Sequence, residues 1–462
     1  MIDKMRLTDA ASRFGGTLVN PDCLFNSVST DSRTIQQGDL FVALSGENFD
    51  AHQFLEQVAD QAAGLVVNRV NKELPLTQWV VEDTVVALGN IARLQREKFQ
   101  GPVIALTGSS GKTSVKEMIA SILRQAGKVH ATRGNLNNHI GVPLTLLVLD
   151  AEDDFSVVEM GASAAGEINY LCSIAKPDVV LINNVQAAHV DGFGSVDGIA
   201  RAKGEIYQNL SKTGTAILNL DDAYSDQWRT LIGSRDCITF SLHGESVKGK
   251  EADVTATDIE AVGNGCYQFM LHCYGQKHLV QLTVPGRHSV SNALAATACA
   301  AAVKAGLTQI VAGLESVQSV AGRLQVKTLP SGARVIDDSY NANPGSVKAA
   351  IDVLAEQHGR KILVLGDMAE LGNTAEQLHS EVGEYAKEAG IDELYSLGQL
   401  SREASAGFSG SQFSGKHFET LNELKEPLIQ EARGSGVTLL VKGSRSARME
   451  RVVDMLLNEG QN

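Results

Sequence analysis

Residues 103 to 114 read Val-Ile-Ala-Leu-Thr-Gly-Ser-Ser-Gly-Lys-Thr-Ser, an apolar run followed by a loop with two glycines. The apolar run predicts a strand, and the apolar positions behind the loop recur with helical spacing up to Gly127. A strand, a glycine loop and a helix form the context of a phosphate-binding loop, because the loop N–H groups and the helix N-terminus face an anion together. We therefore predict that the chain binds a nucleoside triphosphate.

The residue types of this loop predict a division of roles. Lys112 is placed to contact the β- and γ-phosphates, and the hydroxyl of Thr113 to hold Mg²⁺. The loop is two residues shorter than the usual pattern, since Leu106 stands where its first glycine would be. The predicted nucleotide-binding residues are Gly108, Ser109, Ser110, Gly111, Lys112, Thr113 and Ser114.

Composition limits the classes of protein that fit. The chain has 462 residues, 43% of them hydrophobic and 20% charged, which predicts a globular protein of two to four domains. A net charge of −14 disfavours a nucleic-acid partner. No apolar run is long enough to span a bilayer, and the N-terminus has no apolar signal segment. With scattered cysteines and no C-x-x-C pair, we expect a cytoplasmic enzyme.

The order of predicted elements indicates an α/β fold with three domains. Residues 1–83 predict a small α/β unit with short strands, and Asp83 is a candidate N-cap for a helix through Lys98. Residues 84–321 alternate strand and helix, as parallel sheets do, although period-two runs within 236–285 predict an antiparallel patch there. Residues 322–462 predict a second open α/β unit of the Rossmann-like kind.

Polar residues follow several of the predicted central strands. In open α/β sheets ligands bind at the carboxyl ends of strands, so these positions are candidate site residues. Glu159 follows the strand Phe155–Val158 and is a candidate Mg²⁺ ligand. His189 lies in a glycine-rich stretch after another strand, where it could contact a metal or a phosphate. Spacing alone leaves the role of Lys203 open.

A series of motifs in this order resembles the Mur ligases, the ATP-dependent amide ligases that build the peptide stem of bacterial cell-wall precursors. The motifs are Thr107-Gly-Ser-Ser-Gly-Lys-Thr113, Glu159-Met-Gly-Ala162, Asn183-Asn184 with Ala188-His189, Ala202-Lys-Gly-Glu205, Pro285-Gly-Arg-His288 with Asn292, Gly322-Arg323, and Asp337-Asp-Ser-Tyr-Asn-Ala-Asn-Pro344. Three signatures resemble the member of the family that acts on UDP-N-acetylmuramoyl-tripeptide and D-alanyl-D-alanine. They are Tyr340-Asn-Ala-Asn-Pro344, Leu365-Gly-Asp-Met-Ala-Glu-Leu-Gly372, and Lys442-Gly-Ser-Arg-Ser446 with Met449-Glu450.

This resemblance implies two Mg²⁺ sites and a lysine modified by CO₂. Thr113 and Glu159 would hold the first Mg²⁺, while His189 and a carbamate on Lys203 would hold the second. A carbamate suits that position because an ammonium beside Mg²⁺ would be repelled, whereas a carbamate is an anion. The residues that the resemblance implies at the catalytic centre are Lys112, Lys203, His189 and Glu159.

The resemblance also assigns binding residues outside the loop. Asn292, Arg323 and Asp338 would contact the nucleotide. The candidate substrate contacts are Ser32, Arg33 and His52 in the UDP-sugar-binding N-terminal unit, and Asn341 and Asn343 in the C-terminal unit. We expect a monomer. Glycine is common in the family where Ala51 stands, and asparagine where Ser289 stands.

The implied reaction is phosphoryl transfer followed by acyl transfer. The γ-phosphate of ATP would activate the terminal carboxylate of the tripeptide as an acyl phosphate, which the amine of the dipeptide then attacks. Two alternatives stay open at this stage. A related ligase, such as one that adds glutamate to folate, would lack the N-terminal unit and the Asn-Ala-Asn-Pro motif. A nucleotide-gated binding protein without chemistry would need no second metal site.

Overall fold

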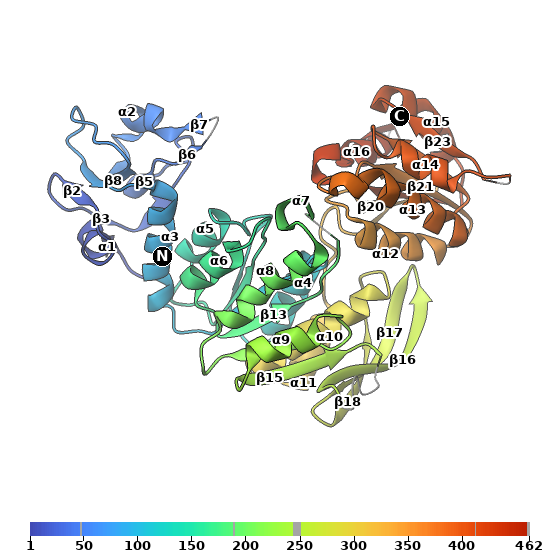
Figure 1. Cartoon of the computed structure of the whole chain (residues 1–462), viewed down its shortest axis with the longest axis horizontal. Helices are drawn as coiled ribbons and strands as arrows, with labels where there is room; N and C mark the ends of the chain where they lie inside the picture. The colour runs from blue at the N-terminus through green and yellow to red at the C-terminus, as the bar shows by residue number, and fades with distance from the viewer. Residues whose placement is uncertain (47–48, 188–189, 244–250, 412, 460–462) are drawn as a thin grey trace.

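The chain contains three separate main sheets, one in each of three successive parts of the sequence (Figure 1). This computed structural model describes residues 1–46, 49–187, 190–243, 251–411 and 413–459. In Figure 1 the N-terminal part and the C-terminal part lie on either side of the central part. The α/β fold class with parallel sheets is confirmed. The domain boundaries after residues 83 and 321 stay predictions.

The N-terminal part is built on a five-stranded sheet. In spatial order its strands are β2 (Thr17–Val19), β9 (Thr77–Val80), β8 (Ala62–Val67), β5 (Asp39–Val42) and β4 (Ser27–Ser29). All neighbours pair in parallel except β2 and β9. The remaining elements are β1 (Met5–Arg6), β3 (Leu24–Phe25), β6 (Ser45–Gly46), β7 (Phe49–Asp50), α1 (Leu7–Phe14), η1 (Ala51–Phe54) and α2 (Leu55–Val58).

Helix α3 (Thr84–Lys98) connects this part to the central sheet. The side chain of Asp83 accepts hydrogen bonds from the N–H groups of Val85 and Val86, at 2.7 and 3.2 Å. These bonds satisfy two of the N–H groups that a helix leaves unpaired at its start. The predicted cap and the predicted helix end at Lys98 are both confirmed.

The central sheet has nine strands, and β10, which leads into the predicted phosphate-binding loop, is third in spatial order. In spatial order the strands are β11 (Val129–Ala131), β12 (Phe155–Glu159), β10 (Val103–Thr107), β13 (Val179–Ile182), β14 (Thr215–Asn219), β15 (Asp236–Ser241), β16 (Val254–Gly263), β17 (Cys266–Cys273) and β18 (Gln276–Gln281). Strand β10 lies between β12 and β13 with parallel pairing on both sides. The carboxyl ends of these three strands therefore meet at one edge.

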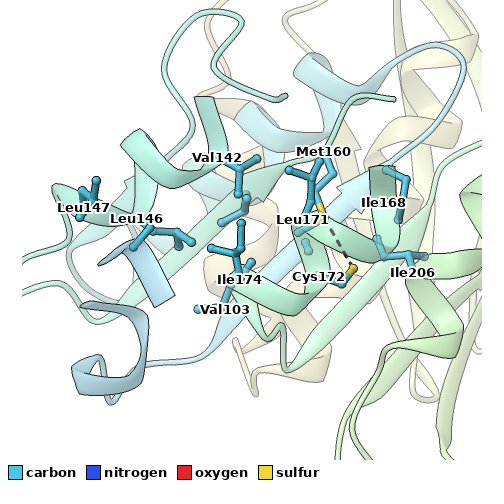
Figure 2. Packing of buried hydrophobic residues seen from close by; sticks show 14 of the residues in the cluster. Val103, Val142, Leu146, Leu147, Met160, Ile168, Leu171, Cys172, Ile174 and Ile206 are labelled. Atoms are coloured by element: carbon cyan, nitrogen blue, oxygen red, sulfur yellow. Dashed lines mark hydrogen bonds between the residues drawn. The ribbon is translucent and has the colours of Figure 1, made fainter. Parts of the chain in front are cut away.

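Both faces of the sheet are covered by helices. Alternate residues of β10 enter opposite cores, with Val103 and Ala105 on one face and Ile104 and Leu106 on the other. The helices are α4 (Lys112–Leu123), α5 (Gly141–Leu147), α6 (Glu167–Ala175), α7 (Val190–Phe193), α8 (Val196–Gln208), α9 (Ser225–Ile232), α10 (His288–Ala302) and α11 (Leu307–Glu315). Figure 2 shows side chains of α5 and α6, with Val103, packed in the first of these cores.

One sequence prediction in this region is wrong in part. Strand β15 (Asp236–Ser241) pairs in parallel with β14 and with β16, so the antiparallel patch does not begin at residue 236. It comprises β16, β17 and β18 instead. Period-two alternation reports which face of a strand is buried, and it carries no information on the direction of the neighbouring strand.

The C-terminal part contains a six-stranded sheet with one antiparallel edge strand. The strands in spatial order are β19 (Gln325–Thr328), β20 (Arg334–Asp338), β24 (Val437–Lys442), β21 (Arg360–Gly366), β22 (Glu393–Leu397) and β23 (Gly415–Phe418). Only the β19–β20 pair is antiparallel. The helices are α12 (Pro344–Ala355), η2 (Gly372–Thr374), α13 (Ala375–Glu388), α14 (Arg402–Phe408), α15 (Leu421–Ala432), η3 (Arg445–Ala447) and α16 (Glu450–Glu459).

No helix in the described ranges combines the length and the hydropathy that crossing a bilayer requires.

Candidate active site

A cleft of about 990 Å³ lies between the central sheet and the C-terminal domain. We call its two sides the loop wall and the C-terminal wall. The predicted residues that line the loop wall are Ser109, Ser110, Gly111, Lys112, Thr113, Ser114 and Asn292. Those that line the C-terminal wall are Arg323, Asp338, Asn341 and Asn343. The fold thus brings together the predicted nucleotide-binding residues of two distant parts of the sequence.

The loop wall is held by hydrogen bonds to the end of the neighbouring strand β13. The N–H of Ser109 donates to the carbonyl of Asn184 at 3.0 Å, and the N–H of Ser110 donates to Asn184 Oδ1 at 2.9 Å. The amide of Asn183 donates to the carbonyl of Ser110 at 3.1 Å. The hydroxyl of Ser109 donates to the carbonyl of Gln186 at 3.0 Å. The loop conformation is therefore set by the protein alone.

Gly111 is required at the turn from the loop into helix α4. Its φ of +75° lies in the left-handed region, which disfavours any residue with a Cβ. A Cβ there would lie 2.6 Å from Asn183 Nδ2 and 2.8 Å from Asn292 Oδ1. Those two amides are hydrogen-bonded to each other at 3.1 Å. Asn292, predicted to contact nucleotide, thus also supports the loop from helix α10.

Glu159 ends strand β12 beside the start of helix α4. Its buried carboxylate accepts hydrogen bonds from the Thr113 hydroxyl at 3.0 Å and from Asn137 Nδ2 at 2.8 Å. Two oxygen donors of the kind that Mg²⁺ prefers are therefore adjacent. Sequence reasoning missed Asn137, although Asn135-Leu-Asn-Asn138 is a cluster of amides, because the strand β11 that precedes it was not predicted. In the described ranges no three His, Cys, Asp or Glu side chains form a metal cluster.

Lys112 and Lys203 lie in an environment that disfavours their charged forms. Lys112 Nζ donates to the carbonyl of Gly108 at 2.7 Å. Burial lowers its pKa, nearby Glu159 opposes this effect, and the charge of Arg323 adds to it. Lys203, on helix α8, is 3% exposed. Burial lowers the pKa of its amine well below the usual value, and the charge of Lys112 lowers it further.

The other predicted metal ligand, His189, lies outside the described residues. Nothing in the described ranges tests its assignment, so the assignment stays a prediction. Glu159 and Lys203 do not line the cleft themselves, and Glu159 reaches it through its contact with Thr113.

The C-terminal wall is built on a buried ion pair. Lys442 Nζ, at the end of β24, donates to Asp338 Oδ2 at 2.5 Å and to the carbonyl of Asn341 at 2.9 Å. The N–H of Arg445 donates to Asn341 Oδ1 at 3.3 Å. Burial lowers the pKa of Lys442, and contact with Asp338 opposes that effect. Lys442 holds Asp338 and Asn341 together at the edge of the cleft.

Asn343 has a structural role beside its predicted substrate contact. Its side-chain oxygen accepts a hydrogen bond from the N–H of Ser346 at 2.8 Å, and the hydroxyl of Ser346 accepts one from the N–H of Asn343 at 3.0 Å. These reciprocal bonds cap the N-terminus of α12. The substrate role of Asn343 stays a prediction.

The three predicted substrate residues of the N-terminal domain do not line the cleft. Arg33 is exposed and pairs with Asp31 at 2.7 Å. The ring of His52 is buried, with Nδ1 2.6 Å from Asp50 Oδ1 and Nε2 accepting the N–H of Asn68 at 3.1 Å. Both ring nitrogens are therefore occupied within the domain. Ser32 is partly buried, and the UDP-sugar roles of the three residues stay predictions.

Comparisons with known proteins agree with this geometry. The profile of the Mur ligase middle domain matches residues 106–300, and that of the Mur ligase, glutamate ligase domain matches residues 322–445. The chain belongs to the Mur ligase family. A relative from Escherichia coli (strain K12) is 45% identical, with 98% of each chain covered. That relative is the UDP-N-acetylmuramoyl-tripeptide–D-alanyl-D-alanine ligase, also called MurF.

Solved structures give the same result. A MurF crystal structure from Acinetobacter baumannii is 38% identical, superposes with a TM-score of 0.91 and covers 99% of both chains. A MurF ligase from Thermotoga maritima, solved in complex with ADP, is 27% identical with a TM-score of 0.81. It covers 94% of this chain and 98% of its own. The three-domain architecture is shared with these MurF proteins.

Proposed function

We propose that this chain joins D-alanyl-D-alanine to UDP-N-acetylmuramoyl-tripeptide and uses ATP to do so. The protein is an ATP-dependent ligase of peptidoglycan synthesis. The single observation that carries the proposal is the cleft, in which a phosphate-binding loop faces a basic wall from a second domain. The relative at 45% identity is named for this reaction, and the match covers 98% of each chain.

The reaction needs activation of a carboxylate, because a carboxylate at neutral pH repels nucleophiles and lacks a good leaving group. The γ-phosphate of ATP moves to the terminal carboxylate of the tripeptide, which gives an acyl phosphate and ADP. The amine of the dipeptide attacks the acyl carbon, and the resulting tetrahedral intermediate releases phosphate to leave the amide. The protein contributes mainly positioning and neutralisation of charge.

Named residues supply these contributions. The loop N–H groups and Lys112 hold the triphosphate, and Lys112 offsets the charge that develops on the transferred group. Arg323 and Asp338 contact the nucleotide from the C-terminal wall, and Asn341 and Asn343 border the acceptor side. A closed cleft excludes water, which would otherwise hydrolyse the acyl phosphate.

The residues around Thr113 fit a magnesium ion. Thr113 and Glu159 present a hydroxyl and a carboxylate oxygen 3.0 Å apart, next to the proposed phosphate site. Mg²⁺ bound there would neutralise charge on the β- and γ-phosphates. We assign a second site to Lys203, as its carbamate, together with His189.

The environment of Lys203 supports the carbamate. A neutral amine attacks the carbon of CO₂, a new N–C bond forms, and one proton leaves for solvent. Burial and the charge of Lys112 favour that neutral amine. The test compares wild type with Lys203→Ala in CO₂-depleted buffer and in buffer with added bicarbonate. We expect bicarbonate to raise wild-type activity only. Full activity of Lys203→Ala in both buffers contradicts the assignment.

A phosphate-release assay tests the proposed function. With MgATP and D-alanyl-D-alanine present, we expect release with UDP-linked tripeptide and much less with the corresponding dipeptide or tetrapeptide. Release with folate and glutamate would instead indicate the folate ligase alternative. Nucleotide binding without phosphate release from any acceptor would indicate a binding protein. The use of ATP and of this nucleotide-linked precursor supports a cytoplasmic location. Light scattering would test the predicted monomeric state.

A further inference from the structure

Tyr340 lies next to two arginines of the C-terminal wall. The guanidinium carbon of Arg323 lies 4.2 Å from the centre of the Tyr340 ring, and that of Arg445 lies 5.7 Å from it. Both distances are within the range in which a cation is attracted to the negative face of an aromatic ring. Two cations that are 122 residues apart in the sequence are therefore attracted to one ring.

The two arginines and the tyrosine differ in their relation to the cleft. Arg323 and Arg445 line the cleft, whereas Tyr340 is not among the described residues that do. An aromatic ring that stacked on the nucleotide would have to be part of that lining. Tyr340 instead contacts two residues of the lining, through the guanidinium groups of Arg323 and Arg445.

The backbone holds Tyr340 firmly against the start of the domain. Its N–H donates to the carbonyl of Gly322 at 3.2 Å. Gly322 has a φ of +70°, and a Cβ there would lie 3.1 Å from the Cβ of Tyr340. Leu324, on the other side of Arg323, also has a positive φ, of +48°. The side chain of Arg323 therefore projects from a tightly turned segment. That turn and the Tyr340 ring together set the direction of the side chain.

The charges of the C-terminal wall indicate what the ring does. Arg323, Arg445, Arg448 and Lys442 bring four positive charges to this wall, which also carries the carboxylates of Asp338 and Glu370, and Asp338 pairs with Lys442. Arg445 reaches Glu450 at 3.3 Å but remains 64% exposed. Without an anion in the cleft, like charges push flexible side chains apart. An aromatic face attracts both guanidinium groups without neutralising them, so they keep their full charge for an anionic ligand.

We propose that Tyr340 is a positioning residue that holds Arg323 and Arg445 toward the phosphates of the bound nucleotide. The proposal rests on the proposed function, because that function supplies the anionic ligand. It goes beyond that function by giving a role to the tyrosine of the Tyr-Asn-Ala-Asn-Pro motif. The ring, and not the hydroxyl, carries the effect.

Calorimetry with MgADP as the probe tests this proposal on the full-length protein. The loss of one partly exposed cation–π contact corresponds to a loss of affinity of roughly 3- to 10-fold, which we expect for Tyr340→Leu and for Tyr340→Met. Tyr340→Phe keeps the ring and should restore most of the affinity. In turnover assays the KM for ATP should rise by a similar factor while kcat falls less.

Tyr385 supplies a matched control. Its ring lies 5.5 Å from Lys348 Nζ on the same domain, and neither residue lines the cleft. Tyr385→Leu therefore removes a cation–π pair of the same kind at a site with no role in binding. We expect its affinity for MgADP to equal that of wild type. Circular dichroism of each variant reports whether the domain is folded.

A double-mutant cycle gives a second, independent measurement. If Tyr340 acts mainly through Arg323, the nearer of the two arginines, the double variant Arg323→Gln/Tyr340→Leu should lose clearly less affinity for MgADP than the sum of the two single losses. Additive losses contradict the proposal, as does a folded Tyr340→Leu or Tyr340→Met with wild-type affinity. Equal losses for Tyr340→Phe and Tyr340→Leu would assign the effect to the hydroxyl and also overturn it. Wild-type protein that fails to bind MgADP would overturn the proposed function first, and this proposal with it.

Discussion

The two walls of the cleft are built in different ways. Apart from Asn292, the loop wall comes from one continuous stretch, residues 109–114, and main-chain groups of that stretch bond to Asn183 and Asn184. The C-terminal wall joins three segments near residues 323, 340 and 442 through charged and aromatic side chains. A main-chain cradle tolerates changes in many side chains, whereas a wall held by side chains depends on each of them. Substitutions in the loop wall should therefore mainly reduce activity or nucleotide binding, whereas substitutions in the C-terminal wall should also reduce stability.

The largest effect is expected in the loop wall, at Lys112, which we propose contacts the phosphates. Lys112→Ala removes the charge that we propose stabilises the transferred phosphoryl group, together with the hydrogen bond from Nζ to the carbonyl of Gly108. We expect kcat/KM to fall by about 1,000-fold, with little change in thermal stability. Phosphate release measures the effect, and Lys277→Ala on the exposed edge strand β18 is the control. Near-normal ligation by Lys112→Ala contradicts the assignment of the loop.

The C-terminal wall should respond to substitution by losing stability. Lys442→Met leaves the carboxylate of Asp338 buried without its partner, which costs roughly 3 kcal/mol of unfolding free energy in the C-terminal domain. The exposed pair of Lys416 with Glu393, in the same domain, provides the comparison. Lys416→Met should change stability by less than about 1 kcal/mol. Urea unfolding measures the unfolding free energy of both variants. Equal losses would show that the buried pair contributes no more to stability than the exposed pair.

A glycine pair separates backbone strain from close packing in the loop wall. Gly111 and Gly134 both have positive φ, but a Cβ would meet neighbours only at Gly111. We expect Gly111→Ala to weaken MgADP binding by about 10-fold or more, since the loop must move away from Asn183. Gly134→Ala should leave binding unchanged. Equal binding by the two variants would mean that the contact with Asn183 does not shape the loop.

The smallest expected effect is at the boundary of the C-terminal wall. Asn343→Ala and Thr420→Ala each remove one N-cap, of α12 and α15, and each should cost about 1 kcal/mol of stability. Only Asn343 borders the cleft, so only Asn343→Ala should raise the KM for D-alanyl-D-alanine. Steady-state kinetics measures this KM. An unchanged KM would mean that Asn343 only caps helix α12.

The same contrast explains what the sequence could reveal. The strand, loop and helix around Lys112 were predictable because their signals are local, and the cap at Asp83 is local too. The contact of Lys442 with Asp338 joins residues 104 positions apart, which no spacing rule reaches. Asn137 was missed because an amide after a short strand resembles an ordinary turn. The antiparallel patch was predicted to begin too early, at residue 236, because alternation does not report the direction of a neighbouring strand.

A crystal structure of the protein with a non-hydrolysable MgATP analogue tests the central claim most directly. The account predicts that the β- and γ-phosphates lie against the N–H groups of residues 109–113 with Lys112 Nζ in contact, and that Arg323 faces them from the opposite wall. A structure in which the loop around Ser109 is empty and the nucleotide occupies another site would contradict it.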